Sequence, residues 1–412
     1  MPRIIMKYDI AIIGAGPAGI MAAITARLNG ASVVLIEKNE AIGRKILATG
    51  NGRCNITNRL AKVENYHGAN PEFIGKVLNS FDQHKTIRFF EDLGLILKEE
   101  DRGRMFPRTN QAASVVDILA HELDRLKVKV RLNTEVKKIE NLDGWKITLH
   151  DGSAVESEKL ILTTGGRAAH QLGSSGDGHF WMKNFGHKIE DTYAALVPLE
   201  TKELWVKDVQ GLKVEAQASF FVDDELVSKR SGDLIFTHFG LSGPAIMSQA
   251  RFVAPFVETK TVQVQLDFMP EQPKHDLDEM IAKIFNISGA KSVKNALVGL
   301  VPAKLIPIIL GESGIDENKN AAEISKTQRA EIVQNLKSLT LTILKLRPLK
   351  EAQVTRGGVS TDEIDSETLE SKKIKNLYFA GEVIDVDGDS GGFNLQWAWS
   401  SGYLSGKCSS ES

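Results

Sequence analysis

Residues 8–19 read Tyr-Asp-Ile-Ala-Ile-Ile-Gly-Ala-Gly-Pro-Ala-Gly, and this stretch decides the fold. The apolar run that ends at Ile13 predicts a buried strand over Tyr8–Ile13, and a helical pattern follows over Gly19–Asn29. A second apolar run predicts a strand over Ser32–Ile36. Strand, helix and strand in this order begin a parallel, doubly wound sheet, so the fold class is α/β.

The glycine turn after the first strand has the GxGxxG spacing of a dinucleotide-binding fingerprint. Its glycines permit a tight turn, close approach of the backbone to a pyrophosphate, and close packing of helix against strand. Glu37 ends the second strand 18 residues after Gly19, where its carboxylate would bond both hydroxyls of an adenosine ribose. The expected cofactor contacts are Gly14, Ala15, Gly16, Pro17, Ala18, Gly19, Glu37 and Lys38.

Glycines near the C-terminus favour FAD over NAD as the cofactor. Leu377–Ala380 reads as a returning strand that ends in Gly381-Glu382, the arrangement with which flavoproteins hold the ribityl chain. Gly391–Ala398 reads as a glycine turn into a helix, whose N-terminus would face the flavin edge that becomes anionic on reduction. The expected contacts here are Gly381, Glu382, Gly392, Phe393, Asn394 and Leu395.

The segment Gly43–Asn55 follows Glu37 directly, so we expect it to run along the cofactor from adenosine towards the flavin. Arg44 and Lys45 supply cations that can pair with pyrophosphate oxygens. The candidate contacts of the segment are Arg44, Lys45, Thr49, Gly50, Asn51 and Asn55. Further candidates are Val136, through its backbone at the adenine, and Thr164, Gly165 and Gly166 after a strand at Lys159–Thr163. Binding is expected to be noncovalent, because no His or Cys is placed for flavin attachment.

The chain resembles the BaiN-type family of bacterial FAD-dependent oxidoreductases. The resemblance rests on IIGAGPAG, GRKILATGNGRCNITN at residues 43–58, THFGLSGPA at 237–245, TRGGV at 355–359 and the ending GEVIDVDGDSGGFNLQWAWSSG, and it covers almost the whole chain. It implies a Rossmann-like FAD domain of the two-dinucleotide-binding-domain flavoprotein type, interrupted by an inserted β-barrel-like and helical domain. The family includes an aminoacetone oxidase and bile-acid-pathway reductases, so the resemblance does not fix the reaction.

Near Ala194 the residue pattern changes from one typical of a parallel sheet to one typical of antiparallel strands. From Asp276 to about Leu344 the pattern is helical, and after Gly406 a Ser-rich tail is expected to fray. We therefore predict an FAD-binding domain in two parts, 1–193 and 348–412, around an inserted substrate or cap domain at 194–347, β-rich over 194–270 and helical over 271–347.

Composition limits the partners. Lys plus Arg number 51 and Asp plus Glu 53, a net charge of −2, which argues against nucleic acid. No run of about 20 apolar residues suggests a membrane span. Two cysteines fit a reducing, cytoplasmic compartment, and no metal-ligand cluster stands out. We expect a small-molecule substrate, and the oligomeric state stays open.

The leading hypothesis is a FAD-dependent oxidoreductase that exchanges hydride between flavin N5 and a small organic substrate or NAD(P)H. With one fingerprint and no redox Cys pair, NAD(P)H would be a transient electron donor. One alternative is an amine oxidase that uses O₂, as an aminoacetone oxidase does. Another is a non-catalytic flavin-binding redox sensor or accessory protein, and the charge disfavours an RNA-modifying flavoprotein. No catalytic residue is assigned, and His170, His179 and His238 are interpreted as structural.

Overall fold

The computed structural model describes residues 6–411, which form two compact units. Unit 1 joins the chain up to Tyr193 with the chain from Gln353 onward, and unit 2 is Ala194–Ala352. Unit 2 thus ends five residues later than the predicted insertion (352 − 347). Within residues 6–411, no helix combines the length and apolar character needed to cross a membrane.

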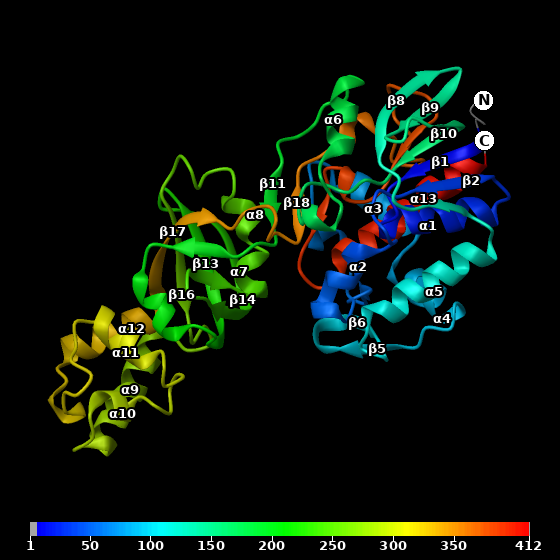
Figure 1. The fold of residues 1–412 in the computed structure, drawn as a ribbon. Helices are drawn as coiled ribbons and strands as arrows, with labels where there is room; N and C mark the ends of the chain where they lie inside the picture. Colours follow the sequence, from blue (N-terminus) through cyan, green and yellow to red (C-terminus); the bar gives the residue numbers. More distant parts are fainter. Residues whose placement is uncertain (1–5, 412) are drawn as a thin grey trace. The chain divides into compact units, whose positions relative to one another are not determined.

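A seven-stranded sheet forms the centre of unit 1 (Figure 1). Its order is β7 (Lys129–Arg131), β2 (Val33–Ile36), β1 (Met6–Ile13), β10 (Ala154–Leu162), β9 (Gly144–Leu149) and β8 (Val136–Leu142), with β19 (Leu377–Phe379) also on β10. The ladders that join β7, β2, β1, β10 and β19 are parallel, whereas β8 and β9 form an antiparallel hairpin on the first half of β10. As predicted, the C-terminal strand returns to the sheet of the first strand.

Two helices cover one face of this sheet beside each other. α1 (Pro17–Leu28) packs along α13 (Phe393–Ser410), the blue and red helices of Figure 1. The prediction of a frayed tail after Gly406 is wrong, because α13 continues to Ser410. A Cβ at Gly406 would lie 2.5 Å from the carbonyl oxygen of Ala22, so the helices touch by their backbones. Ser409 is 1% exposed, and its hydroxyl donates to the carbonyl of Gly406.

Shorter elements complete unit 1. Its further helices are α2 (Arg44–Ala48), α3 (Pro71–Ser80), α4 (Gln83–Asp92), α5 (Ala112–Arg125) and α6 (Asp177–Asn184). Its 3-10 turns are Thr49–Gly52, Val63–Asn65, Asp101–Gly103, His170–Leu172, Thr361–Glu363 and Gly381–Val383. Its small strands are β3 (Thr57–Asn58), β4 (Tyr66–His67), β5 (Leu97–Glu100), β6 (Arg104–Pro107), β18 (Val354–Arg356) and β20 (Asp387–Gly388), while β11 (Tyr193–Ala195) spans the boundary to unit 2.

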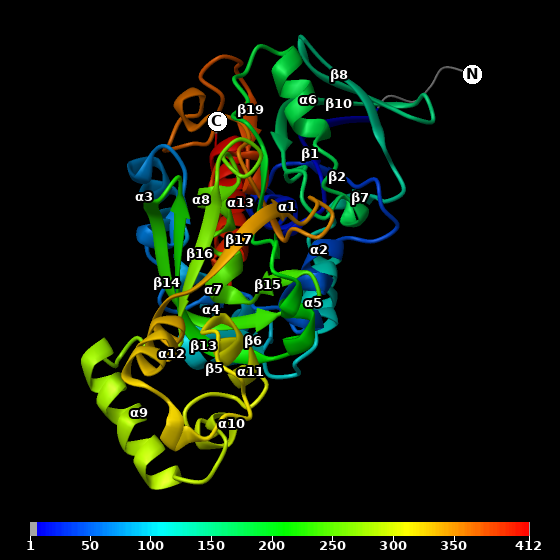
Figure 2. The ribbon, with the colours of Figure 1, turned by 90° about the vertical axis from the view of Figure 1, so that its left-hand side faces the viewer.

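Unit 2 contains a closed, antiparallel six-stranded barrel. Its strands, in barrel order, are β12 (Leu199–Thr201), β15 (Gly240–Ser242), β14 (Glu225–Phe236), β13 (Lys213–Val222), β16 (Val262–Asp267) and β17 (Leu339–Leu346). α7 (Pro244–Met247), α8 (Ala250–Val253) and a 3-10 turn at Leu204–Val209 accompany them. Figure 2 shows α9 (Lys274–Ser288), α10 (Val293–Ala296), α11 (Ile306–Glu312) and α12 (Lys326–Ser338) gathered beyond one end of the barrel, with a 3-10 turn at Ala321–Glu323 among them.

The prediction of helical structure through residue 347 is wrong for β17. Leu339, Leu341 and Ile343 alternate with Thr340 and Thr342, and the three apolar side chains are buried. This period of two places them inside the barrel, where β17 pairs with both β16 and β12 and so closes the sheet.

Candidate functional site

The glycine fingerprint forms the turn between β1 and α1. A Cβ at Gly19 would lie 1.9 Å from the carbonyl oxygen of Gly14, so strand and helix are too close for a side chain there. At Gly16 no atom lies within 4 Å of the Cβ position. α1, which begins with Pro17 and Ala18, has no side-chain N-cap and no acidic residue in its first turn. The turn is therefore tightly packed at Gly19 and open at Gly16. At that open position the dipole of α1 would attract a pyrophosphate.

Glu37 follows β2 and lies against this turn, 8% exposed. One carboxylate oxygen accepts a hydrogen bond from the backbone N–H of Ala15 at 2.8 Å. The other accepts from the backbone and the side-chain amide of Asn39, at 2.9 and 2.6 Å. A carboxylate accepts about four hydrogen bonds, so about one position is open. The prediction that Glu37 has acceptor positions for both ribose hydroxyls therefore needs correction: a second hydroxyl has to displace the Asn39 amide.

The loop before β8 also reaches Glu37, because the N–H of Thr134 donates to its carbonyl at 2.8 Å. Val136 opens β8 two residues later and pairs there with Leu149. Arg44 donates to the side-chain oxygen of Asn39 at 3.0 Å, so its guanidinium stays beside Glu37. These contacts bring together Glu37 and the start of β8, both predicted for the adenosine end, and they hold Arg44, which was predicted for the pyrophosphate, beside Glu37.

Two lysines predicted as cofactor contacts have acidic partners. Lys38 pairs with Asp177 at 3.1 Å, a contact that ties it to the start of α6. Lys45 pairs with Glu382 at 2.5 Å, across 337 residues of sequence. The prediction that Lys45 pairs with pyrophosphate oxygens is therefore replaced: its ammonium group faces the Gly381-Glu382 segment, which was predicted to hold the ribityl chain.

Glu382 is the centre of a second set of contacts. Its other carboxylate oxygen accepts from the backbone N–H of Thr355 at 2.9 Å. A Cβ at Gly166 would come within 2.8 Å of that same oxygen, so the glycine turn after β10 runs directly beside it. In this turn the hydroxyl oxygen of Thr164 is buried and has no hydrogen-bond partner among the described residues. Gly165 adopts a left-handed conformation and passes close to Ser174.

The Gly43–Asn55 segment ends against the loop before α13. The side-chain oxygen of Asn55 accepts from the N–H of Met105, which makes Asn55 a buried structural residue. Asn58, slightly further on, donates to the carbonyl of Gly391 at 2.9 Å. A Cβ at Gly392 would lie 2.6 Å from the carbonyl oxygen of Thr57, so only glycine fits at this start of α13.

The first residues of α13 use their side chains for packing and for loop contacts, so only their backbone N–H groups are left for a ligand. Phe393 and Leu395 are buried in the two hydrophobic cores of unit 1. The Asn394 amide donates to the carbonyl of Gly388 and accepts from its N–H, both at 2.8 Å, and so holds the preceding loop. α13 has no side-chain N-cap and no acidic residue in its first turn, which leaves an open, partially positive helix end.

The middle of the Gly43–Asn55 segment stands at the surface. Thr49 bonds back to the carbonyl of Ile46 at 2.7 Å, and the exposed Gly50 and Asn51 both adopt left-handed conformations. No contact of these residues with the fingerprint or the Glu382 cluster is seen among the described residues. Their predicted contact with a cofactor stays a prediction.

Together these contacts form one row within unit 1. The row runs from Glu37 past the open fingerprint and the Lys45–Glu382 pair to the open end of α13. Two uncapped helix N-termini lie along it, and the buried hydroxyl of Thr164 has no hydrogen-bond partner within residues 6–411. An elongated dinucleotide with a central pyrophosphate and an electron-accepting ring fits this order of groups, and FAD is such a molecule.

Three buried titratable groups elsewhere in unit 1 have structural surroundings. Burial lowers the pKa of His179, whose imidazole bonds the carbonyl of Val383 at 3.1 Å. His187 lies between Glu363 and Ser371, each at 3.0 Å, in the order of a hydrolytic triad. The Ser371 oxygen also accepts hydrogen bonds from two backbone N–H groups, and the His187 side chain is fully buried. These three residues therefore cannot attack a substrate. Burial raises the pKa of Cys54 to about 12, which makes its thiol unreactive.

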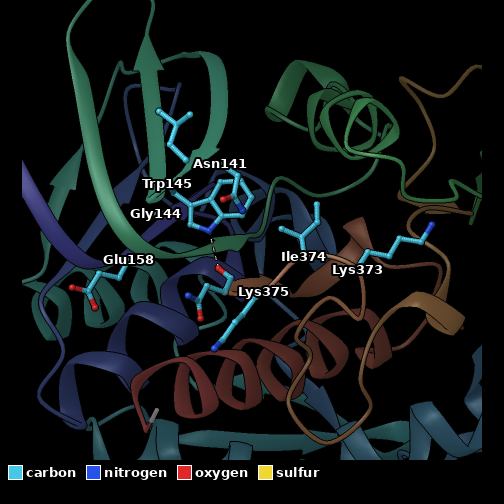
Figure 3. Close-up of a pocket in the computed structure, with 9 residues that line it drawn as sticks. Asn141, Gly144, Trp145, Glu158, Lys373, Ile374 and Lys375 are labelled. Carbon is cyan, nitrogen blue, oxygen red and sulfur yellow. Dashed lines mark hydrogen bonds between the residues drawn. The ribbon is translucent and has the colours of Figure 1, made fainter.

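A surface cavity of about 360 Å³ lies on another part of unit 1 (Figure 3). Residues 373–376, just before β19, line it together with Glu158 and the β8–β9 turn around Trp145. The indole N–H of Trp145, which Figure 3 labels, donates to the carbonyl of Asn376 at 2.9 Å. The cavity thus lies before β19 and beside the middle of β10, whereas ligands of parallel sheets bind at the carboxyl ends of the strands.

Comparison with known proteins agrees with this fold and site. The family model for the HI0933-like protein Rossmann domain matches residues 8–408. The chain belongs to the HI0933-like family. This HI0933-like protein is 37% identical to the 3-dehydro-bile acid delta(4,6)-reductase of Clostridium scindens, over 98% of this chain and 99% of the relative. It is 33% identical to the ribosomal RNA dihydrouridine synthase of Escherichia coli K12, over 96% of each chain.

The fold also recurs in a solved structure, the 3-ketosteroid-delta4-(5alpha)-dehydrogenase of Rhodococcus jostii RHA1 in complex with 4-androstene-3,17-dione. The TM-score is 0.52 at 15% identity, and the match covers 99% of this chain and 97% of the other. At that identity the likeness shows the fold alone. Family membership and the full-length relatives identify the HI0933-like protein as a flavin-dependent oxidoreductase.

Sequence reasoning missed three residues of the row. Asn39 links Glu37 to Arg44, and only its position two residues after Glu37 signalled a role. Thr355 binds Glu382 through its backbone and accepts from the N–H groups of Arg167 and Ala168 through its hydroxyl. It opens the TRGGV segment of residues 355–359. Asn58, the last residue of GRKILATGNGRCNITN, clamps Gly391.

Proposed function

We propose that this HI0933-like protein uses FAD to reduce a carbon–carbon double bond conjugated with a carbonyl group, with NADH or NADPH as the transient electron donor. The row of contacts from Glu37 to α13 carries the proposal, because its open helix ends fit a flavin dinucleotide and it holds no reactive thiol. The names of the two full-length relatives describe one kind of chemistry. A delta(4,6)-reductase acting on a 3-oxo steroid acid and a dihydrouridine synthase both saturate a double bond beside a carbonyl.

The residues of unit 1 have distinct roles in this reaction. The open N-terminus of α1 would hold the pyrophosphate, and Glu37 with Asn39 the adenosine ribose. Glu382, neutralised by Lys45, would hold the ribityl chain. The uncapped end of α13 would stabilise negative charge on the flavin edge. Bound FAD supplies hydride at N5, so the chain itself need only orient substrate, exclude water and deliver a proton.

A uracil base in ribosomal RNA is the second candidate substrate. The net charge of −2 argues against RNA, but a relative that matches over 96% of this chain is named for this activity. Reduction of the conjugated double bond of uracil requires a hydride and a proton, as reduction of a steroid enone does. The two substrates differ in what the surface around the site has to recognise, not in the chemistry at the flavin.

The test is anaerobic reduction and reoxidation of the flavin. The purified protein should be yellow and release intact FAD on denaturation. NADH or NADPH should bleach the flavin, and 4-androstene-3,17-dione, a 3-oxo-4,6-diene bile acid or unmodified ribosomal RNA should restore its colour. Anaerobic bleaching by small amines, followed by release of hydrogen peroxide when air is admitted, would favour the amine oxidase. Colour that no acceptor restores would favour a redox sensor, and the reductase assignment would be withdrawn.

A further inference from the structure

A small sheet of unit 1 carries arginines on one of its faces. β6, labelled in Figure 1, is the middle strand between β3 and β5. Side chains two residues apart on a strand point to the same side, so Arg104 and Phe106 share a face of β6. The guanidinium groups of Arg53 and Arg104 both lie over the Phe106 ring, 4.2 and 5.9 Å from its centroid. Arg108 continues this alternation just after β6 and is exposed.

β5 adds one cation and one acid to the same face. Its register places Lys98 opposite Phe106 and Glu100 opposite Arg104. Glu100 pairs with Arg53 and also with Lys98, the latter at 2.9 Å. The hydrogen bond from Arg53 and then that from Lys98 lower the pKa of Glu100 to about 2. This carboxylate is therefore ionised and already shared between two cations.

The face has more positive than negative charge. Its charged members, called the cationic face below, are Arg53, Lys98, Glu100, Arg104 and Arg108, four cations and one carboxylate. Asp101 and Arg102, in the turn between β5 and β6, balance each other in formal charge. Arg104 donates to the carbonyl of Asp101 at 3.0 Å, and neither Arg104 nor Arg108 has an acidic partner within residues 6–411. The net charge of −2 for the whole chain thus does not describe this surface.

The cationic face adjoins the α13 end of the row through β3. Asn58 pairs with Arg104 in the ladder between β3 and β6, and its amide donates to the carbonyl of Gly391 just before α13. Paired strands lie about 5 Å apart, so Arg104 is one strand away from that contact. The exposed turn at Gly50 borders the face as well, because a Cβ there would lie 3.1 Å from the Phe106 ring.

Arginines without acidic partners are suited to bind phosphate. The planar guanidinium group can donate two parallel hydrogen bonds to phosphate oxygens. Small ligands usually bind in concave pockets, whereas a chain of phosphates can bind along an open surface through several cations. In enzymes that modify a base, phosphate contacts position the nucleic acid while the reacting base is turned out into the active site.

We propose that the cationic face binds the phosphates of an RNA substrate and so places a uracil base at the flavin, an inference that rests on the proposed reductase function. Arg104 and Arg108 each bind a phosphate group. Arg53 stays stacked on Phe106 and adds to the positive potential. RNA, and not a steroid acid, is then the substrate that the surface beside the row recognises.

The test measures RNA binding by the FAD-loaded full chain at several salt concentrations. The probe is a fluorescein-labelled single-stranded RNA rich in uracil, and binding is followed by fluorescence anisotropy. Arg104→Gln and Arg108→Gln should each reduce the slope of log affinity against log salt by about 0.7, the value for one phosphate of a single strand. At 0.1 M salt, tenfold below 1 M, this slope corresponds to an affinity about 5-fold weaker, and to about 25-fold for the double variant.

Controls separate charge recognition from damage to the fold. Arg88→Gln removes an exposed arginine of α4 and should bind RNA like wild type. Arg108→Lys should keep the salt slope, whereas Arg108→Glu should bind RNA more weakly than Arg108→Gln. No hydrogen bond or ion pair of the Arg108 side chain is seen within residues 6–411, so its variants decide the question even if Arg104→Gln does not fold.

An activity readout uses two acceptors with each variant. The flavin is reduced anaerobically with dithionite and reoxidised by unmodified ribosomal RNA or by 2-cyclohexen-1-one, which has no phosphate. At low RNA concentration, the ratio of the RNA rate to the cyclohexenone rate should fall about 5-fold in each single variant. High RNA concentration should restore the ratio, because the variants weaken binding and leave the reaction at the flavin intact.

Several results would overturn the inference and leave the reductase function standing. They are a wild type that does not bind RNA, a double variant that binds RNA within twofold of wild type, and variants that need more NADPH but bind RNA normally. Reoxidation by 4-androstene-3,17-dione but not by bound ribosomal RNA would overturn RNA as the substrate. RNA binding with the expected slopes, but no reoxidation by any of the three acceptors, would overturn the reductase function and leave an RNA-binding surface.

Discussion

Replacing Glu37 with Ala tests the cofactor site at its adenosine end. The change removes the acceptor of the buried Ala15 N–H, which lies 2.8 Å from the carboxylate. An unsatisfied buried donor costs about 1–3 kcal/mol, so the apoprotein should lose that much stability against denaturant. The Asn39 donors are partly exposed and can turn to water, so they add little.

FAD affinity should fall by a comparable amount. With about one open acceptor position on Glu37, one charge-assisted hydrogen bond to the ribose is lost, worth about 1.5–3 kcal/mol. That corresponds to an affinity about 10- to 150-fold weaker. Glu37→Gln keeps the shape but turns an amide N–H₂ towards one of the donors, so it should fall between wild type and Ala. Turnover in excess FAD should stay near wild type.

The assays are urea denaturation of the apoprotein and fluorescence titration with FAD. Glu40→Ala is the matched control, because it removes an exposed glutamate three residues further on and should change neither quantity. Unchanged stability and unchanged FAD affinity in Glu37→Ala would falsify the placement of the adenosine end at this strand, and with it the role of the fingerprint.

Three shorter predictions follow from other contacts. Lys45→Met leaves the Glu382 carboxylate without its cation and should weaken FAD binding by about 10-fold in the same titration, whereas Lys45→Arg should bind FAD nearly as tightly as wild type. Because burial raises the pKa of Cys54 to about 12, the thiol should resist a disulfide reagent at pH 8 in the folded protein and react only on denaturation; rapid reaction would contradict its burial. Burial lowers the pKa of His187 below its ordinary 6.5, so the unfolded chain binds the proton more readily than the folded chain. The stability that His187 contributes is therefore complete above pH 6.5 and is lost as the pH falls through the pKa of the folded state. His187→Gln should flatten the loss of stability on this acid side, whereas the exposed His121→Gln should leave the slope of a denaturation series unchanged.

Local patterns predicted a large part of unit 1. The run that ends at Ile13, the fingerprint and the strand that precedes Glu37 formed as expected, because a glycine turn and an apolar run are decided within a few residues. The alternation in β17 was equally visible in Leu339, Leu341 and Ile343. It was read as helix because the surrounding segment is helical, although a period of two distinguishes a strand.

Composition alone gave a wrong prediction for the Ser-rich end of α13. The serines after Gly406 suggest a frayed tail, since serine does not favour a helix interior. In the structure, Lys159 donates to the carbonyl of Ser409 at 2.7 Å, and the glycines let α13 approach α1. Both contacts come from segments far away in sequence, so no local pattern reveals them.

The βαβ start, the glycine turns and the class of cofactor could be predicted from the sequence, because turn geometry and side-chain period depend on near neighbours. The pairing of the charged groups could not be predicted in this way. Lys45 pairs with Glu382 instead of facing a pyrophosphate, Asn39 fills acceptor positions of Glu37, and Asp389 meets His67. Lys45 and Glu382 are 337 residues apart, and Asp389 and His67 are 322 apart. A charged group takes the partner that is nearest in space, and that distance is set only when the sheet has brought both ends of the chain together.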